Sequence, residues 1–364
     1  MRPPARHPHS RRGQLEVSFS WIYVLVAGGA FLLLFFLIIR GCMSTNELQT
    51  DAGSLKAASL AFGGLAWQTQ TITNLTMPAA KVSCPATAVS LISDKGAVSM
   101  DRIPVFLPPE VGGRLRVVIK EITLSRTNTP AVPLGSALYG IDDNTYYYLL
   151  SDSGASAAGR VSAILNSPNV RTRQSGQLSL ERLPRTAKSI VLVRFDDLPF
   201  PTGISWPAGA KVYGVRLKVP SGGIGVVTFL ELHSNTWDQA GPLREYAGDY
   251  LMAGAVVAAQ SGTYECAKNA LAVRMRYLTR IYQLRSQHLF GLGPVELSNS
   301  CKDIHGQIAG RVPGPGNLTP INNVSLTPDD VYLQSLLGMQ STSVGPRLLE
   351  AQDNLYIMGC PVIA

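Results

Sequence analysis

The sequence predicts an α+β protein with an amino-terminal transmembrane helix, an antiparallel β-rich, sandwich-like middle and a helical carboxyl-terminal part. Three observations support this prediction. An uncharged apolar stretch, Trp21–Ile39, lies near the start of the chain. From residue 71 to 235, short runs of β-favouring residues alternate with clusters of Pro, Gly, Asn and Asp. From residue 238 to 364, apolar residues recur instead at the three- and four-residue steps of a helix.

The apolar stretch is long enough to span a membrane. At about 1.5 Å per helical residue, it crosses a hydrocarbon core about 30 Å thick. Four arginines and one acid precede it, whereas after Arg40 no basic residue occurs before Lys56. This bias predicts a cytoplasmic basic tail over residues 1–18, a span over 19–40 and a large domain outside the cell membrane. A cleaved secretory signal is the alternative, but the apolar run exceeds the usual length of about 7–15 residues.

A juxtamembrane helix and a series of strands are predicted to follow the span. Residues 44–64 carry a helical apolar stripe, and Gly63-Gly64 is expected to end that helix. Six runs are strong candidate strands: Val98–Leu107, Leu115–Leu124, Thr145–Leu150, Ser189–Phe195, Lys211–Val219 and Gly225–Leu232. No helical pattern separates them, which favours an antiparallel sandwich. Ser151–Gly159 is expected to form an exposed loop.

The carboxyl-terminal region predicts three helices. The first begins near Cys266 and ends at Gly291, and its apolar face is expected to comprise Ala270, Val273, Tyr277, Ile281 and Leu284. After a Pro/Gly/Asn linker at 310–326, Thr327–Asp330 has the composition of a helix start. The last helix is predicted over Arg347–Ile357. The first helix also carries five cations, interpreted as a solvated face, with acidic lipid or an acidic partner as the alternative: Lys268, Arg274, Arg276, Arg280 and Arg285.

The cysteines predict disulfides in the outer domain. Cys42 lies at the predicted membrane edge, and four more follow: Cys84, Cys266, Cys301 and Cys360. An even number in an oxidising location predicts two disulfides. Of the three pairings we favour Cys266–Cys301 with Cys84–Cys360, since the former would brace a helix against its following loop. Free buried thiols are the alternative. Three sequons provide candidate glycosylation sites, at Asn74, Asn317 and Asn323.

Charge and composition exclude two classes of protein. The formal net charge is +8, but the tail and Arg40 carry about half of it, so residues 41–364 are nearly neutral for their length. A nucleic-acid partner is therefore not predicted. Charged residues make up 15% and hydrophobic residues 46% of the chain, which excludes a disordered stalk.

No motif identifies a catalytic, cofactor-binding or metal-binding residue, and we predict none. His-x-x-x-His and Cys-x-x-Cys spacings are absent from the sequence. Cys301 and His305 stand four apart, as a thiol–imidazole pair would, but a disulfide is favoured for the cysteine. Gly203–Pro207 lacks the second glycine of a nucleophile elbow, so it predicts a turn with a buried Trp206. Asp142-Asp143-Asn144 could offer oxygens to calcium, although a turn is the favoured interpretation.

The segment Arg11–Phe19 resembles the class III signals of archaeal pilins and archaellins. In those proteins a peptidase cuts after a basic residue and glycine, which here corresponds to the bond between Gly13 and Gln14. The resemblance implies that the retained apolar helix packs with its copies in a filament core. Glu16 would be third after the cut, whereas the acid of those families usually stands fifth.

A second resemblance covers nearly the whole chain. The amino-terminal segment RGQLEVSFSWI and four later motifs occur in order: Ile103–Phe106, Tyr146–Leu149, Tyr264–Cys266 and Cys360-Pro361. Together they resemble a group of uncharacterised single-span archaeal membrane proteins. The resemblance implies the single-span topology and the cysteine positions, and it implies no activity.

The predicted function is a single-pass, membrane-anchored surface or envelope protein with a structural or interaction role, not an enzyme. Its predicted partners are the lipid bilayer and a membrane or surface protein, or a second copy approached through Gly28-Gly29-Ala30. The alternatives are a pilin-like subunit processed after Gly13 and an extracytoplasmic hydrolase. A pocket joining His233 or His305 to a carboxylate and a hydroxyl would favour the hydrolase, whereas an exposed apolar patch would favour binding.

Overall fold

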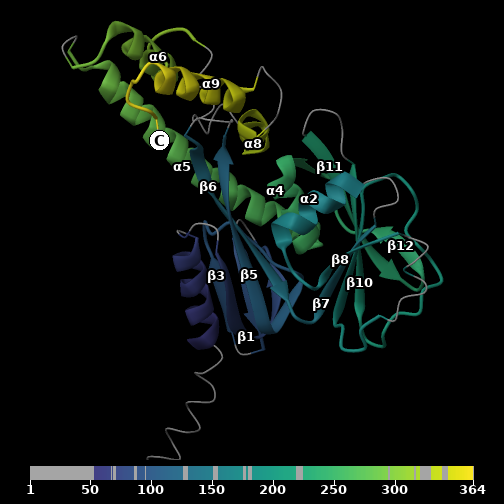
Figure 1. Ribbon diagram of the computed structural model, residues 1–364. Helices are drawn as coiled ribbons and strands as arrows, with labels where there is room; N and C mark the ends of the chain where they lie inside the picture. Colours follow the sequence, from purple (N-terminus) through teal and green to yellow (C-terminus); the bar gives the residue numbers. More distant parts are fainter. Residues whose placement is uncertain are drawn as a thin grey trace, which may run out of the picture. The chain divides into compact units, whose positions relative to one another are not determined.

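The computed structural model describes residues 53–363 except for 67, 69–70, 86–87, 95, 126–129, 151–154, 175–177, 179–182, 219–223, 294–295, 315–316, 320–328 and 338–342. The predicted tail, span and processing site lie outside these residues, and so does Cys42. Within the described part of the chain, no helix is both long and apolar enough to cross a membrane. The α+β class is confirmed, because the described residues form two sheets and several packed helices (Figure 1).

The first sheet is almost entirely antiparallel. Its strand order is β3-β2-β1-β5-β6-β4, and only the short β4–β6 pair is parallel. The strands are β1 Ile72–Ser83, β2 Val89–Ser93, β3 Gly96–Met100, β4 Val105–Phe106, β5 Glu110–Leu124 and β6 Val132–Asp142. The register between β1 and β5 shifts between Met77 and Ala80, opposite Gly113 with its φ of 86°. This bulge bends β1 near the place where the two sheets meet.

The second sheet has a parallel centre. Its order is β12-β11-β10-β9-β7-β8, with β13 paired to β11, and the β7–β8, β7–β9 and β9–β10 pairs are parallel. Its strands are β7 Thr145–Leu150, β8 Val170–Arg173, β9 Ser189–Arg194, β10 Lys211–Lys218, β11 Ile224–His233, β12 Thr236–Gln239 and β13 Arg244–Ala247. Every residue of β9 is buried, because one core cluster covers Val191 and Val193 while another covers Ile190 and Leu192.

The predicted antiparallel sandwich without intervening helices is therefore wrong. Helix α2, Ala155–Leu165, connects the parallel strands β7 and β8, and it occupies part of the expected Ser151–Gly159 loop. Parallel neighbours require such a crossover. The alanines of α2 favour a helix, and burial of Val161 and Leu165 outweighs the local signals of serine and glycine. Helix α4, Gly248–Ala258, contacts strands of both sheets.

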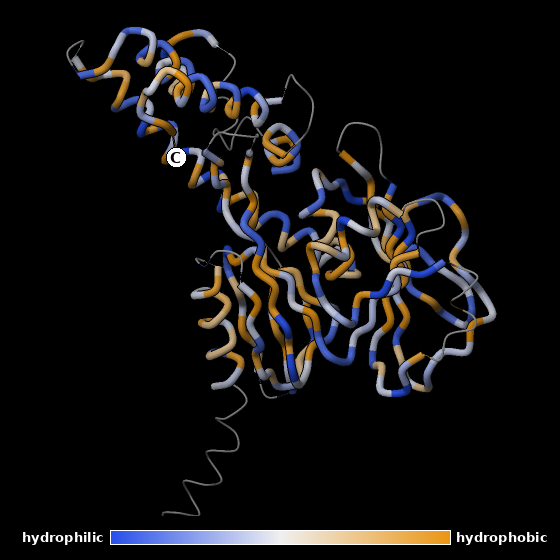
Figure 2. Tube along the Cα trace, in the orientation of Figure 1, coloured by the Kyte–Doolittle hydropathy of each residue, from blue (hydrophilic) through white to orange (hydrophobic). Residues whose placement is uncertain are grey.

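The remaining helices gather in the carboxyl-terminal part, as predicted. They are α5 Ser261–Phe290, α6 Asn299–Ala309, α8 Asp329–Leu337 and α9 Val344–Ile357. The long α5 begins beside the sheets and continues to α6 and α9 (Figure 1). In Figure 2 the strands of both sheets are largely hydrophobic, whereas α5 and α9 alternate between hydrophobic and hydrophilic residues.

The helix at the amino-terminal end of the described chain covers residues 53–65. It ends one residue after the Gly63-Gly64 pair at which the sequence predicts its end. Its buried residues include Leu55 and Phe62. Its last turn is held by side chains of the domain, because the hydroxyl of Ser136 donates to the Ala66 carbonyl at 2.7 Å, and the guanidinium of Arg274 donates to the same oxygen. These donors satisfy the helix end without a left-handed glycine.

Close packing of α4 on Phe106 gives a stability prediction. A Cβ atom on Gly254 would lie 2.6 Å from the ring of Phe106, which is fully buried and stacks on Tyr139 with centroids 5.6 Å apart. We expect Gly254→Ala to lower the free energy of unfolding by about 1–3 kcal/mol through overpacking. Gly159→Ala in α2 is the control: no atom lies within 4 Å, so it should stabilise by up to about 1 kcal/mol. Chemical denaturation of the full chain in detergent measures both, and equal effects would contradict this packing.

Candidate functional site

Helix α5 holds two of its five cations inside the protein. Lys268 and Arg276 are 2% and 6% exposed, so the predicted solvated face is wrong for them. Lys268 Nζ lies 2.9 Å from Glu265 Oε2 and also contacts Asp330 at the start of α8. Arg276 Nη2 lies 3.1 Å from Asp329 Oδ1. Lys268 thus has one acid on α5 and one on α8, whereas Arg276 lies beyond the last acid of α5 and pairs with Asp329 of α8.

Aromatic rings complete this contact between α5 and α8. The Lys268 ammonium lies 5.6 Å from the ring centroid of Tyr264, and the Arg276 guanidinium lies 4.2 Å from that of Tyr332. The Tyr332 hydroxyl also lies 3.0 Å from Thr279 Oγ1. Cation–π contacts and hydrogen bonds together fix which side of α5 faces α8.

The opposite side of α5 is apolar and exposed. Of the residues expected to form its buried face, Ala270 is buried, but Tyr277, Ile281 and Leu284 are 58%, 56% and 48% exposed. The prediction fails because the buried side is instead rich in polar residues that find partners. Two exposed arginines flank the apolar residues. We call Tyr277, Arg280, Ile281, Leu284 and Arg285 the α5 outer face.

Helix α9 carries a second exposed apolar surface of different charge. Tyr356, Ile357 and Met358 are 50%, 76% and 46% exposed. Glu350 is also exposed and lies two turns before Ile357, hence on the same side of the helix. The half-buried Arg347 lies one turn earlier. We call Glu350, Tyr356, Ile357 and Met358 the α9 outer face.

Two disulfides are present, as predicted, but the favoured pairing is wrong. The bonds join Cys84 to Cys266 and Cys301 to Cys360, with Cα atoms 6.2 and 5.8 Å apart. Cys266 lies near the start of α5, whereas Cys301 lies in α6, which follows its far end. The 24 residues from Cys266 to Phe290 extend about 36 Å as a helix, which separates those two cysteines.

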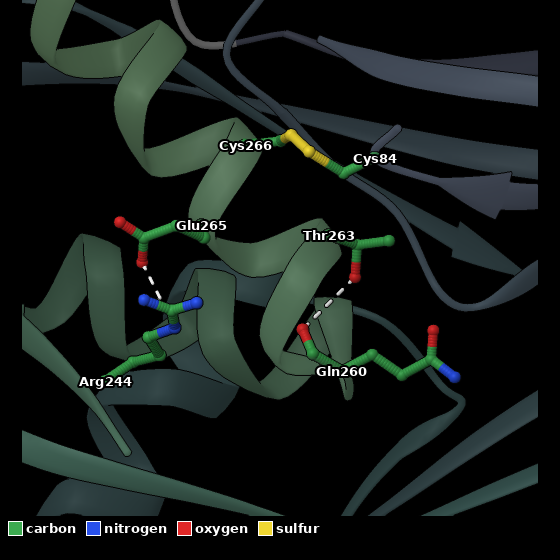
Figure 3. Close-up of a disulfide and its surroundings, with 6 residues drawn as sticks. All are labelled: Cys84, Arg244, Gln260, Thr263, Glu265 and Cys266. Atoms are coloured by element: carbon green, nitrogen blue, oxygen red, sulfur yellow. Dashed lines mark hydrogen bonds and ion pairs between the residues drawn. A yellow bond between two sulfur atoms is a disulfide. The ribbon is translucent and has the colours of Figure 1, made fainter. Parts of the chain in front are cut away.

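Each disulfide ties part of the helical region to a distant segment. Cys84–Cys266 joins the segment after β1 to the second turn of α5, where Glu265 Oε2 also lies 3.5 Å from Arg244 Nε (Figure 3). Cys301–Cys360 joins α6 to the segment after α9. The two bonds thus restrain the surroundings of α5 near both of its ends.

The other residues singled out in the sequence have structural roles. Asp142 accepts hydrogen bonds from the backbone of Gly112 and Asn144 at 3.2 and 3.0 Å, as expected for the predicted turn. Burial raises the pKa of Asp142, although these hydrogen bonds and Lys188 oppose the shift. Cys301 has no free thiol to offer His305. Burial lowers the pKa of His305, which keeps its ring neutral.

The sequons differ in their surroundings. Asn74 is exposed on β1, opposite Arg116 of β5. Asn317 is half-buried, and its side-chain oxygen accepts from the Thr319 backbone amide at 2.9 Å. Asn323 lies outside the described residues. Of the two described sequons, the exposed Asn74 is therefore the one whose side chain is more open to modification.

Two clefts lie at the margins of the second sheet. The first has a volume of about 330 Å³ and lies at the β1 bulge, where it is lined by Glu110, Asp142 and Lys188. The second, of about 490 Å³, contains His233 together with Glu231 and Ser234. His305 lies in neither cleft. Within the described residues, no group of three or more His, Cys, Asp or Glu residues could hold a metal ion.

Comparison of the chain with protein-family models, with curated proteins and with solved structures found no match. The surfaces and clefts of the protein itself are therefore the basis on which its function can be proposed.

The buried cation of α5 gives a second stability prediction. Lys268→Met should lower the free energy of unfolding by about 2 kcal/mol, because Glu265 and the half-exposed Asp330 lose their cation. Lys56→Met, at an exposed cation of the first helix, should change it by less than about 0.5 kcal/mol. Adding Asp330→Leu to Lys268→Met should recover part of the loss, since the two changes remove one interaction. Strictly additive losses would contradict the described ion pair.

Proposed function

We propose that the chain is a single-pass membrane-anchored component of the cell surface or envelope, and that it assembles with copies of itself. Its amino terminus would lie in the cytoplasm and its large domain outside. The apolar stretch Trp21–Ile39 and the preceding arginines support the anchor and its orientation. Two disulfides within the domain support an oxidising, extracytoplasmic location.

The observation that carries the proposal is the pair of exposed apolar helix faces with different charge. The α5 outer face contains two exposed arginines and no acid, whereas the exposed charge of the α9 outer face is Glu350, which follows the half-buried Arg347 by one turn. Exposed apolar residues flanked by charge are typical of interaction surfaces, and tyrosine and arginine are enriched among residues that dominate binding. We infer that the α5 outer face of one copy binds the α9 outer face of the next.

Such a contact has a direct structural consequence. It joins two different surfaces, so it is heterologous, and each copy keeps one free face of each kind. A heterologous contact generates a closed ring if the rotation between copies closes, and an open array if it does not. For chains anchored in one membrane, the same contact would generate a lateral assembly. This gives a structural role that requires no catalytic site.

Charge reversal tests the self-assembly. In native membranes, Arg280→Glu combined with Arg285→Glu should abolish most crosslinked multimers, because both faces would then be acidic. Adding Glu350→Arg should restore them, while Lys56→Glu should have no effect. Chemical crosslinking followed by electrophoresis measures this series. Unchanged multimers in the double variant, or no recovery in the triple variant, would rule out this contact.

The anchor and its processing are tested separately. Protease added to intact cells should digest the large domain, and protection that is lost only on lysis would refute the proposed location. Intact-mass measurement distinguishes the two forms of the anchor. Retention of residues 1–13 is expected for a plain anchor, and their loss would favour the pilin-like alternative with cleavage between Gly13 and Gln14.

A further inference from the structure

The second cleft lies away from both outer faces and has a different chemistry. Its volume is about 490 Å³, within the range of about 300–1,000 Å³ that is usual for small-molecule sites. It is lined by residues from four segments of the chain: Trp206 before β10, Lys211 and Tyr213 on β10, Glu231 and His233 at the end of β11, and Gln260 between α4 and α5. No short sequence motif unites these residues.

The polar groups of the cleft hold one another in place. Glu231 accepts a hydrogen bond from Gln260 Nε2 at 3.2 Å, and its other oxygen lies 3.5 Å from His233 Nε2. Glu231 and His233 are two residues apart on β11, so both side chains lie on the same side of the sheet. Tyr213 is the direct cross-strand neighbour of Glu231. Carboxylate, amide and imidazole groups therefore converge from two sides of the cleft.

The charged groups of the cleft have partners within the protein. Lys211, its one lysine, forms an ion pair with Glu110. Glu231 has His233 and Gln260 as neighbours. Burial and the nearby carboxylates of Glu110 and Glu231 raise the pKa of Tyr213, so its hydroxyl stays protonated at neutral pH. Because Lys211 is paired with Glu110, a phosphate finds no unpaired lysine here, whereas the Glu231 carboxylate, beside an amide and an imidazole, can accept hydrogen bonds from the hydroxyls of a neutral ligand.

An aromatic ring supplies the apolar part of the cleft. Trp206 is half-buried and lines the cleft together with the polar groups, and it packs against the smaller core cluster on the other side of the second sheet from Glu231. A sugar ring has an apolar C–H face and hydroxyls at its edge. An indole face with neighbouring planar hydrogen-bonding groups complements both.

We propose that this cleft binds a neutral saccharide of one to three residues. The sugar's C–H face would pack on Trp206, and its hydroxyls would hydrogen-bond to Glu231, His233 and Gln260. The proposed ligands of the domain are therefore surface carbohydrates. This inference goes beyond the proposed self-assembly and does not depend on it, because neither outer face contributes to the cleft.

Binding to defined saccharides tests the inference. The full chain in detergent is titrated with a panel of neutral and N-acetylated mono-, di- and trisaccharides, and saturation-transfer NMR with tryptophan fluorescence detects binding. We expect saturable binding of at least one panel member at millimolar concentrations. Trp206→Ala and Glu231→Ala should each raise its Kd by about tenfold or more.

Two controls separate loss of the site from loss of the fold. Lys188→Ala, in the first cleft, should leave the Kd unchanged, and thermal unfolding should show that every variant is folded. Arg280→Glu with Arg285→Glu should also bind normally, so failure of assembly and failure of saccharide binding are distinguishable. No saturable binding by any saccharide, or equal binding by folded Trp206→Ala, would overturn the proposal.

Discussion

The ion pairs between α5 and α8 are the constraint on which the helical region depends. Glu265 is the one acid of α5 and pairs with Lys268, so the buried Arg276 requires a carboxylate from another element. Asp329 and Asp330 at the start of α8 meet this requirement, and the rings of Tyr264 and Tyr332 complete it. Leaving a buried charge unpaired would cost more free energy than the helix could recover by rotating to bury one apolar side chain. The α5 outer face is exposed as a consequence.

This constraint explains why apolar periodicity misassigns α5. Spacing alone assigns Tyr277, Ile281 and Leu284 to a core face. It considers only the positions of apolar residues and not the polar partners that other helices supply. The buried side contains two polar residues with partners. Thr279 hydrogen-bonds to the Met275 carbonyl and to the Tyr332 hydroxyl, and Gln283 donates to the Thr319 hydroxyl. In the sequence, the acids at positions 329–330 indicate only a helix start. Their second role, as partners of Lys268 and Arg276, can be seen only once it is known that α8 lies against α5.

The sequence predicts some local elements and not others, and it predicts pairings poorly. The expected strand Val98–Leu107 is divided between β3 and β4, and the sequence does not single out β1, β2, β6 or the helices α4 and α6. β5, β7, β9, β10 and β11 all lie within predicted β-favouring runs or extend them at the ends. The parallel order of the second sheet is not predictable in this way, because it depends on partners far apart in the chain. The same holds for the disulfides: the sequence identifies the four cysteines, but their pairing depends on the direction of α5. The saccharide cleft combines Trp206, Glu231 and Gln260, whose proximity no sequence spacing indicates.

The two proposed sites are compatible because one helix separates them. Gln260, at the cleft, precedes Tyr277, at the outer face, by 17 residues, or about 25 Å of helix. The part of α5 between the two sites is held by the Cys84–Cys266 disulfide and the buried ion pairs. Both sites are therefore ordered before a ligand binds. Preorganisation of this kind lowers the entropy cost of binding. Contacts between copies through α5 and α9 would then leave each cleft open, and an anchored assembly would present many weak saccharide sites whose combined avidity exceeds that of one copy.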